Sequence, residues 1–529
     1  MSTNVDEKAA AVGLEEDTAA NLNALKQTTT IDTVHNDEAL KVIAQFCGDH
    51  EWTEQEEKKL RRKIDSRLLP ILCITYGLQY YDKAMLGQAA LFGLRKDLEL
   101  ETGMRYSWSA SIFYLGFICG AYPAILLAQR YPIERVASAI IVVWGACLMC
   151  TTACSSWKGL YAQRFFLGFL ESGISPMFML VVGGWYKKNE QALRMGAWYC
   201  CTGYVSIVSP LINYGLGHIN GSLAQWKYMY LVAGALTILW AIIIFFLMPP
   251  DPIRAKGFSD RERYVAVARL QSNNAGVRNT HFKIAHVWDA ATDLRFWLAF
   301  SMAFLLMIAN GPVSSFTPII ISGFGYSGLN ALLLTMPAGF VSGTIELLAP
   351  LAAYKIPKAR TYIIFICECG TIMASALLWK LSRSSKGGLL FAVYFLPSFG
   401  GAYAVMMGLQ IANTAGYTKR SVTSSGLFVG YCLGNFVGPF LFKVKDAPEY
   451  APGFTACIAT SVAAACLSIV YRFFCIWENN RRDDTGIAEA YEHAYEDDLT
   501  DRKVSYRKLQ QLPRPSQPQL AAALKSTAR

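Results

Sequence analysis

The segment LLPILCITYGLQYYDKAMLGQAALFGL, residues 68–94, decides the fold of this chain. It is longer than the roughly 20 residues that an apolar helix needs to cross about 30 Å of hydrocarbon. Two ionisable residues, Asp82 and Lys83, interrupt it near its middle. A charge at the centre of a bilayer costs about 2.5 to 3.5 kcal/mol on insertion scales, and such residues mark functional sites in membrane helices. The segment therefore predicts a membrane helix that carries part of a functional site.

The rest of the chain repeats this apolar pattern. Of 529 residues, 53% are hydrophobic and only 17% are charged, which excludes an ordinary soluble domain. We predict an all-α polytopic membrane protein with twelve transmembrane helices in two six-helix bundles. The twelve apolar segments cover residues 68–90, 108–128, 136–155, 159–182, 194–216, 227–248, 294–322, 328–353, 361–380, 388–413, 420–442 and 453–477.

A polar segment divides the twelve helices into two sets of six. Pro249, Pro250 and Pro252 end the sixth helix, and SDRER at residues 259–263 can start a short surface helix. We expect five parts: a cytosolic N-terminal tail with a short amphipathic helix (1–66), an N-terminal bundle (67–248), a cytosolic linker (249–293), a C-terminal bundle (294–478) and a cytosolic C-terminal tail (479–529).

Loop charge predicts the orientation, because Lys and Arg collect on the cytosolic side of membrane proteins. With both termini cytosolic, most basic loop residues fall inside: Arg130, Arg135, Lys187, Lys188, Arg194, Lys355, Lys358, Arg360, Lys419 and Arg420. The net charge of +10 thus reflects topology and predicts no nucleic-acid partner. Asn220 begins an Asn-Gly-Ser triplet in an external loop and is a possible glycosylation site. We expect a multi-pass protein of the plasma membrane.

Four ionisable residues fall at mid-depth, and they are the main candidate site. Asp82 and Lys83 lie on the first helix, while Arg164 and Glu171 lie on the fourth in RFFLGFLESGISP. A spacing of seven returns Arg164 and Glu171 to nearly the same helix face. Four charges at about 3 kcal/mol each cost roughly 12 kcal/mol before pairing. Function explains that cost better than an ion-pair cluster that only fastens the two helices, which stays open as an alternative.

Other polar residues at membrane depth are weaker candidates. Asn310, Gln410 and Asn413 can contact a substrate or bond neighbouring helices, and the sequence does not separate these roles. Glu346 and Glu368 are expected near helix ends, where they reach basic loop residues such as Lys355 or Arg360 in a structural role.

The eleventh helix carries a glycine at every fourth position. We expect Gly426, Gly430, Gly434 and Gly438 to form a smooth face for close helix packing.

Absent motifs narrow the function. The chain has no GxxxxGK[ST] phosphate loop, no HExxH or GxSxG site in a plausible context, and no TVGYG-like filter. Cys147, Cys150 and Cys154 have ligand-like spacing but lie in an apolar segment without a histidine partner, so we predict packing and no metal. The strongest interpretation is a secondary transporter, which is not an enzyme and needs no cofactor.

Several motifs carry a family resemblance. They include KKLRRKIDSRLLP at 58–70, DKAML at 82–86, WYKKNEQALRMGAWY at 185–199 and QIANTAGYTKR at 410–420. Over residues 57–505 the chain resembles a major facilitator superfamily transporter of the fungal allantoate permease type, in the anion:cation symporter branch. The resemblance implies alternating access and proton-coupled uptake of a small organic anion such as a carboxylate, ureido acid, vitamin or sulfonate.

The resemblance also implies roles for the candidate residues. Asp82 and Lys83 are similar to the Asp-basic pair of the first helix, and Arg164 and Glu171 to the fourth-helix residues that serve anion binding and proton coupling. We therefore expect proton coupling at Asp82 and Glu171, and substrate binding at Lys83, Arg164, Asn310, Gln410 and Asn413.

Two alternatives stay open. The first is a major facilitator exporter of a secondary metabolite; residues 196–217, in the fifth helix, lack the GPxxGG-like stretch typical of such antiporters. The second is a nutrient sensor that binds without turnover, which long regulatory tails would favour.

Overall fold

The computed structural model describes residues 51–249, 251–252, 254–255, 257–270, 284–414 and 417–484. Most of the two predicted tails, and linker residues 271–283, lie outside the described residues. The predicted amphipathic helix before residue 67 is the first part of α3, which continues into the membrane segment. Thr53 caps α3, and Glu54, Glu56 and Glu57 complement the positive end of its dipole.

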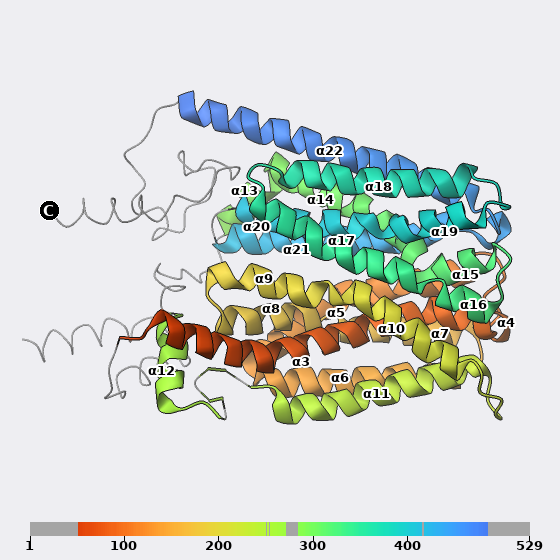
Figure 1. Ribbon diagram of the computed structural model, residues 1–529, viewed down its shortest axis with the longest axis horizontal. Helices are drawn as coiled ribbons and strands as arrows, with labels where there is room; N and C mark the ends of the chain where they lie inside the picture. Colours follow the sequence, from red (N-terminus) through yellow and green to blue (C-terminus); the bar gives the residue numbers. More distant parts are fainter. Residues whose placement is uncertain are drawn as a thin grey trace, which may run out of the picture.

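The described elements form two bundles that lie side by side (Figure 1). The first bundle contains α3 (Glu54–Ala89), α4 (Leu94–Asp97), α5 (Arg105–Arg130), α6 (Ile133–Met149), α7 (Trp157–Glu171), α8 (Ile174–Trp185), α9 (Lys188–Tyr199), α10 (Cys201–Leu216) and α11 (Gln225–Leu247). The second contains α13 (Ile284–Ala291), α14 (Leu294–Ile308), α15 (Thr317–Ser322), α16 (Gly328–Leu333), α17 (Met336–Lys355), α18 (Arg360–Lys380), α19 (Lys386–Phe395), α20 (Phe399–Ala412), α21 (Tyr417–Val437) and α22 (Ala451–Asp484). Between them, α12 (Asp260–Ala268) lies at one end of the molecule, which we call the linker end; the opposite end is the far end.

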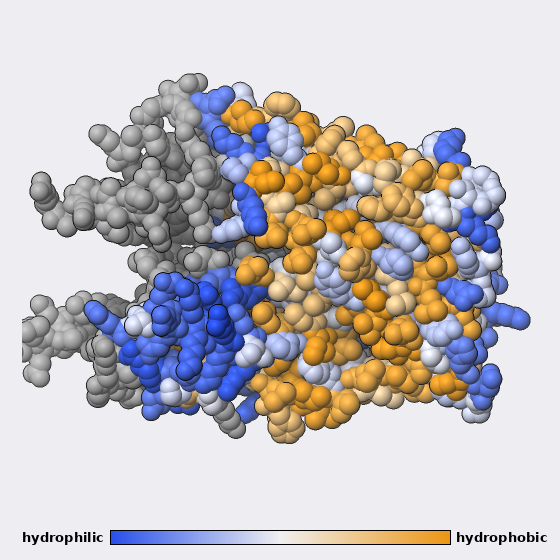
Figure 2. Space-filling model, in the orientation of Figure 1, coloured by the Kyte–Doolittle hydropathy of each residue, from blue (hydrophilic) through white to orange (hydrophobic). Residues whose placement is uncertain are grey.

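Apolar side chains form a broad band across the middle of the face shown in Figure 2, with hydrophilic residues towards both ends. Ten helical segments of the described chain are long and apolar enough to cross a membrane. The predicted first and eleventh spans, in α3 and α21, are not among these ten, and both contain charged and polar residues. They nevertheless run through the bundles beside the apolar helices, so the structure has a helix at each of the twelve predicted positions (Figure 1).

Several spans are broken near mid-depth. The fourth span divides into α7 and α8 around Gly173, and the seventh passes through a π-helical stretch at Pro312–Phe316. The tenth is interrupted by a 3₁₀ turn at Leu396–Ser398, which contains Pro397. Proline removes a backbone donor and clashes with the preceding turn, which explains the last two breaks. Broken helices expose backbone and side chains where a cavity can form.

Hydrogen bonds join the two bundles towards the far end, where α5 begins. The Tyr106 hydroxyl donates to the Ser315 carbonyl at 2.6 Å, and the Ser111 hydroxyl donates to the Phe436 carbonyl at 2.7 Å. Ser107 donates to the carbonyl of Phe442 at 3.3 Å. These contacts hold the far ends of the bundles together.

The linker helix α12 is attached to the first bundle. Ser259 and Glu262 form a capping box at its start, which confirms the predicted surface helix. The Lys63 ammonium lies 2.6 Å from Glu262, and Arg261 lies 3.1 Å from Glu56. Both pairs connect α12 to the first turns of α3.

The predicted glycine face of the eleventh helix is confirmed. A Cβ on Gly434 would clash with the Phe304 carbonyl, and one on Gly438 would lie 2.6 Å from the Ile308 carbonyl oxygen. The missing side chains thus let α21 approach α14.

A buried ion cluster closes the linker end of the second bundle. The Asp293 carboxylate, at the start of α14, accepts from the Arg295 guanidinium at 2.8 Å and from the Lys419 ammonium at 2.7 Å. Burial raises the pKa of Asp293, but the hydrogen bonds and charges of Arg295 and Lys419 outweigh it and lower the pKa to about 2. The ionised carboxylate therefore stabilises the contact between α14 and α21.

We predict that Asp293→Asn lowers the thermal stability of the purified protein, because breaking a buried pair costs about 3 to 5 kcal/mol. An Asp pKa near 3.9 in the unfolded chain and near 2 in the folded one means that the wild-type advantage is complete above about pH 4 and disappears as pH falls towards 2. Thermal unfolding of both proteins in detergent across this pH range measures the difference in stability. Equal melting temperatures at pH 6 would contradict the assignment.

Candidate functional site

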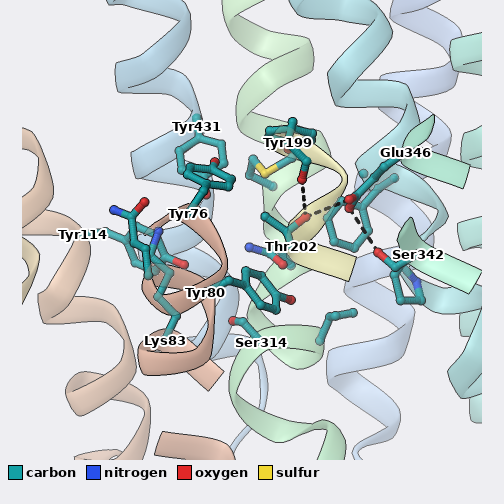
Figure 3. A pocket seen from close by; sticks show the side chains of 17 residues that line it. Tyr76, Tyr80, Lys83, Tyr114, Tyr199, Thr202, Ser314, Ser342, Glu346 and Tyr431 are labelled. Carbon is teal, nitrogen blue, oxygen red and sulfur yellow. Dashed lines mark hydrogen bonds between the residues drawn. The ribbon is translucent and has the colours of Figure 1, made fainter. Parts of the chain in front are cut away.

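A cavity lies between the two bundles near mid-depth (Figure 3). The first bundle lines it with Tyr76, Gln79, Tyr80, Lys83, Tyr114, Tyr199 and Thr202. The second bundle lines it with Met307, Asn310, Val313, Ser314, Ser342, Glu346, Pro397, Phe399, Gly400 and Tyr431. The π-helical stretch and the proline break of the second bundle both reach this wall, so the broken helices shape the cavity.

Among the described residues that line the cavity, Lys83 and Glu346 are the charged ones, and each comes from a different bundle. The Lys83 ammonium lies 5.3 Å from the ring centre of Phe113 and 4.6 Å from that of Phe117. The two rings stabilise the cation without neutralising it. Five tyrosines complete much of the wall: Tyr76, Tyr80, Tyr114, Tyr199 and Tyr431. The cavity thus offers a cation, a carboxylate, hydroxyl groups and aromatic faces to a small polar ligand.

Arg164 lies behind the cavity wall. Its side chain is buried, its Nε donates to the Ser109 carbonyl at 3.2 Å, and its guanidinium lies 5.2 Å from the ring centre of Phe113. Lys83 contacts the same ring, and of these two cations Lys83 is the one that lines the cavity. Arg164 therefore adds positive charge behind the wall, where it acts on Glu171 as Lys83 does.

Asp82 and Glu171 are also behind the wall. Both are fully buried, and among the described residues neither carboxylate has a hydrogen-bond partner on either oxygen. Glu171 lies within electrostatic range of Lys83 and Arg164, while the polar neighbours of Asp82 include Trp144. Direct ion pairing would give these oxygens partners, so the geometry does not favour the purely structural cluster. Unpartnered carboxylates at membrane depth are typical of proton relays.

The three predicted amides occupy different places. Asn310 lines the cavity, and its amide donates to Asn435 at 2.6 Å, so it can serve both packing and binding. Gln410 donates to Thr423 at 2.6 Å, and Asn413 donates to Tyr471 at 3.0 Å. The wall of the cavity does not include Gln410 or Asn413. Their predicted contact with a substrate stays a prediction, and their hydrogen bonds favour helix packing.

The expected pairing of Glu346 and Glu368 with basic loop residues is wrong. Glu346 lines the cavity and accepts hydrogen bonds from Thr202 at 2.7 Å and from Ser342 at 3.1 Å. Glu368 is fully buried in α18, with no partner on either oxygen among the described residues. Both carboxylates are buried within the bundle, although their positions in the sequence had suggested that they lie near helix ends.

Sequence reasoning missed the cavity role of Glu346 and of the tyrosines. Tyrosine is common at membrane interfaces, so its presence in an apolar segment did not indicate a cavity. The position of Tyr80 in the sequence could have indicated the cavity. It lies only two residues before Asp82 and therefore at nearly the same depth in the membrane as the charged pair.

Asn220 lies in the loop between α10 and α11 at the far end and is exposed. Its glycosylation stays a prediction.

A family model described as Major Facilitator Superfamily matches residues 72–439. The chain belongs to this superfamily. An uncharacterised transporter of Schizosaccharomyces pombe is 36% identical, with 84% of this chain and 83% of that protein covered. The allantoate permease of Saccharomyces cerevisiae is 33% identical, with 88% of each chain covered, which confirms the resemblance to that type. The thiamine pathway transporter of the same yeast is 29% identical, with 91% of this chain and 90% of that protein covered.

Solved structures agree with this fold. A D-xylose–proton symporter superposes with a TM-score of 0.58 at 11% identity, covering 77% of this chain and 96% of the other. A bacterial homologue of the lysosomal transporter Spinster, inward-facing and occupied, gives a TM-score of 0.55 at 15% identity with the same coverage. At such low identity the likeness supports the fold alone. The predicted major facilitator fold is confirmed, and the protein is a multi-pass membrane transporter.

We predict that Lys83→Gln weakens anion binding about tenfold or more, because it removes a charge-assisted hydrogen bond worth roughly 1.5 to 3 kcal/mol. Arg164→Lys keeps the charge behind the wall but loses the bond to the Ser109 carbonyl, so it should lower turnover more than apparent affinity. Anion uptake kinetics, corrected for surface abundance, separate the two effects. An unchanged apparent affinity in Lys83→Gln would remove Lys83 from the substrate site.

Proposed function

We propose that this transporter takes up a small organic anion, such as a carboxylate, ureido acid, vitamin or sulfonate, together with protons by alternating access. The observation that carries the proposal is the pair of unpartnered, fully buried carboxylates, Asp82 and Glu171, beside two cations. A structural pair would be satisfied internally, whereas carboxylates that gain and lose protons need no fixed partner.

In this proposal the transported anion and Glu171 compete for the same cations, and this competition couples anion entry to proton uptake. In the empty cavity, the charges of Lys83 and Arg164 act on Glu171. An arriving anion at Lys83 weakens that electrostatic support, so proton uptake by Glu171 becomes easier. The proton then offsets the negative charge of the anion, so the loaded site carries no additional net charge while the bundles move. We assign Glu171, which interacts with Lys83 and Arg164, as the main proton carrier and Asp82 as a second carboxylate that can take up a proton.

Alternating access requires contacts that open and close around the cavity. The bonds from Tyr106 and Ser111 to the second bundle join the far ends, so the observed state is closed there. In the proposed orientation both termini and α12 are cytosolic, the far end faces outwards, and the protein resides in the plasma membrane. The allantoate permease among the relatives supports allantoate, a ureido acid, as the first substrate to test.

The test uses Glu171→Gln in reconstituted vesicles that contain labelled allantoate or the best anion from a substrate screen. A permanently neutral residue should keep anion exchange between the two sides but lose accumulation driven by an inward proton gradient. Glu368→Gln is the matched control, since Glu368 is an equally buried, unpartnered carboxylate outside the cavity wall. That control should keep both activities.

Full gradient-driven accumulation by Glu171→Gln would remove its proton-carrying role. The same result for Asp82→Asn as well would overturn the mechanism. Loss of a preloaded anion that is driven by external acid would instead identify an exporter.

A further inference from the structure

We propose that Glu346 forms the second pole of the substrate site, and that the transported anion carries an N–H donor at the end away from its anionic group. The inference rests on the proposed function, because Lys83 must hold the anionic group. It narrows the substrate from any small anion to one with an amide or amine at its opposite end.

The two charged residues of the described cavity wall belong to opposite sides of the cavity. Lys83 projects from α3 of the first bundle, and Glu346 projects from α17 of the second (Figure 3). A ligand that spans the cavity therefore meets the Lys83 amine on one side and the Glu346 carboxyl group on the other. An extended molecule with an acid at one end and an N–H donor at the other satisfies both.

The Glu346 carboxylate has acceptor capacity left. One oxygen accepts from the Thr202 hydroxyl at 2.7 Å and the other from the Ser342 hydroxyl at 3.1 Å. An ionised carboxylate offers about four acceptor sites, so these two bonds leave room for a further donor. Glu346 is 7% exposed and lines the cavity, which keeps the remaining sites within reach of a ligand.

Bare backbone makes space for this carboxylate. A Cβ on Gly400 would lie 2.6 Å from the Glu346 Oε1, which is closer than real side chains approach. Gly400 itself lines the cavity. The absence of a side chain at this position on α20 thus allows the carboxylate to sit at the cavity surface.

The Thr202 hydroxyl can give up its bond to Glu346 without being left unpaired. It carries one hydrogen but has two acceptors in reach, the Glu346 carboxylate at 2.7 Å and the Tyr199 carbonyl at 2.9 Å (Figure 3). When a substrate N–H takes the acceptor site that Thr202 occupies on Glu346, the Thr202 hydrogen turns to Tyr199. Since Thr202 and Glu346 belong to different bundles, this exchange also releases a hydrogen bond between them. A donor-bearing substrate therefore both fits the site and frees the bundles to move.

The experiment compares two series of probes on the purified protein in detergent at one pH. The first series is the monoamides of the four- to eight-carbon dicarboxylic acids, from succinamate to suberamate. The second is the matching monomethyl esters, which have the same single negative charge and nearly the same shape but lack the N–H donor. At the chain length that spans the cavity, the amide should bind wild-type protein about tenfold more tightly than the ester.

Variants separate a substrate contact from a packing role. Glu346→Met, which has no comparable acceptor, should bring the amide-to-ester ratio close to one, and Glu346→Gln, which keeps a neutral acceptor, should give an intermediate ratio. Thr202→Val removes the competing donor and should keep or raise the ratio. Glu368→Gln, a buried carboxylate outside the cavity wall, should leave the ratio unchanged.

Two outcomes overturn this inference alone: equal binding of both series to the wild type at every length, or a wild-type ratio in both Glu346 variants. A ratio lowered as much by Thr202→Val as by Glu346→Met would assign the pair to bundle packing and also overturn it. If neither series binds the wild type, anion recognition fails and the proposed function falls too. A failure of proton coupling leaves this gradient-free measurement unaffected.

Discussion

The cost of an unpartnered charge in an apolar medium is the constraint on which this structure depends. Asp82 and Glu171 are fully buried, and none of the described residues donates a hydrogen bond to their carboxylate oxygens. An unpaired charge at these positions destabilises the fold, and protonation of the carboxylate removes that cost. Lys83 and Arg164 both contact the Phe113 ring, and Lys83 lines the cavity. In the proposed mechanism a ligand reaches Lys83, while Arg164 stays with Glu171 behind the wall.

The rest of the architecture gives these charges a cavity and two moving walls. Helix breaks at Pro312–Phe316 and at Pro397 bring irregular backbone to the wall of the second bundle. The hydrogen bonds that close the far end run from side-chain hydroxyls to backbone carbonyls, such as that of Ser315. Because they involve no charged group, they can form and break without leaving a buried charge unpaired. At mid-depth, the bond from Thr202 to Glu346 joins the walls through the cavity itself. In the proposed site, ligand contacts and bundle contacts thus involve the same side chains.

The sequence predicted the helices well and placed the four central charges inside the bundle, because apolar length and charge at membrane depth are both visible in one dimension. The roles of these charges stay predictions. It did not predict which side of a helix faces the cavity. Gln410 and Asn413 lie on a helix whose other residues are mostly apolar, so periodicity gave no direction, and both bond within the second bundle. The prediction for Glu346 was wrong for a related reason. Its partner was sought among the loop residues near it in the sequence, whereas its partner Thr202 belongs to the other bundle.

Proton movement coupled to anion entry is the central claim, and the most direct measurement is the internal pH of vesicles that start without a pH gradient. When the transported anion is added outside, the account predicts that the lumen acidifies in step with anion uptake, because each loaded cycle carries protons through Glu171. Anion entry at the same rate with no change in internal pH would contradict it.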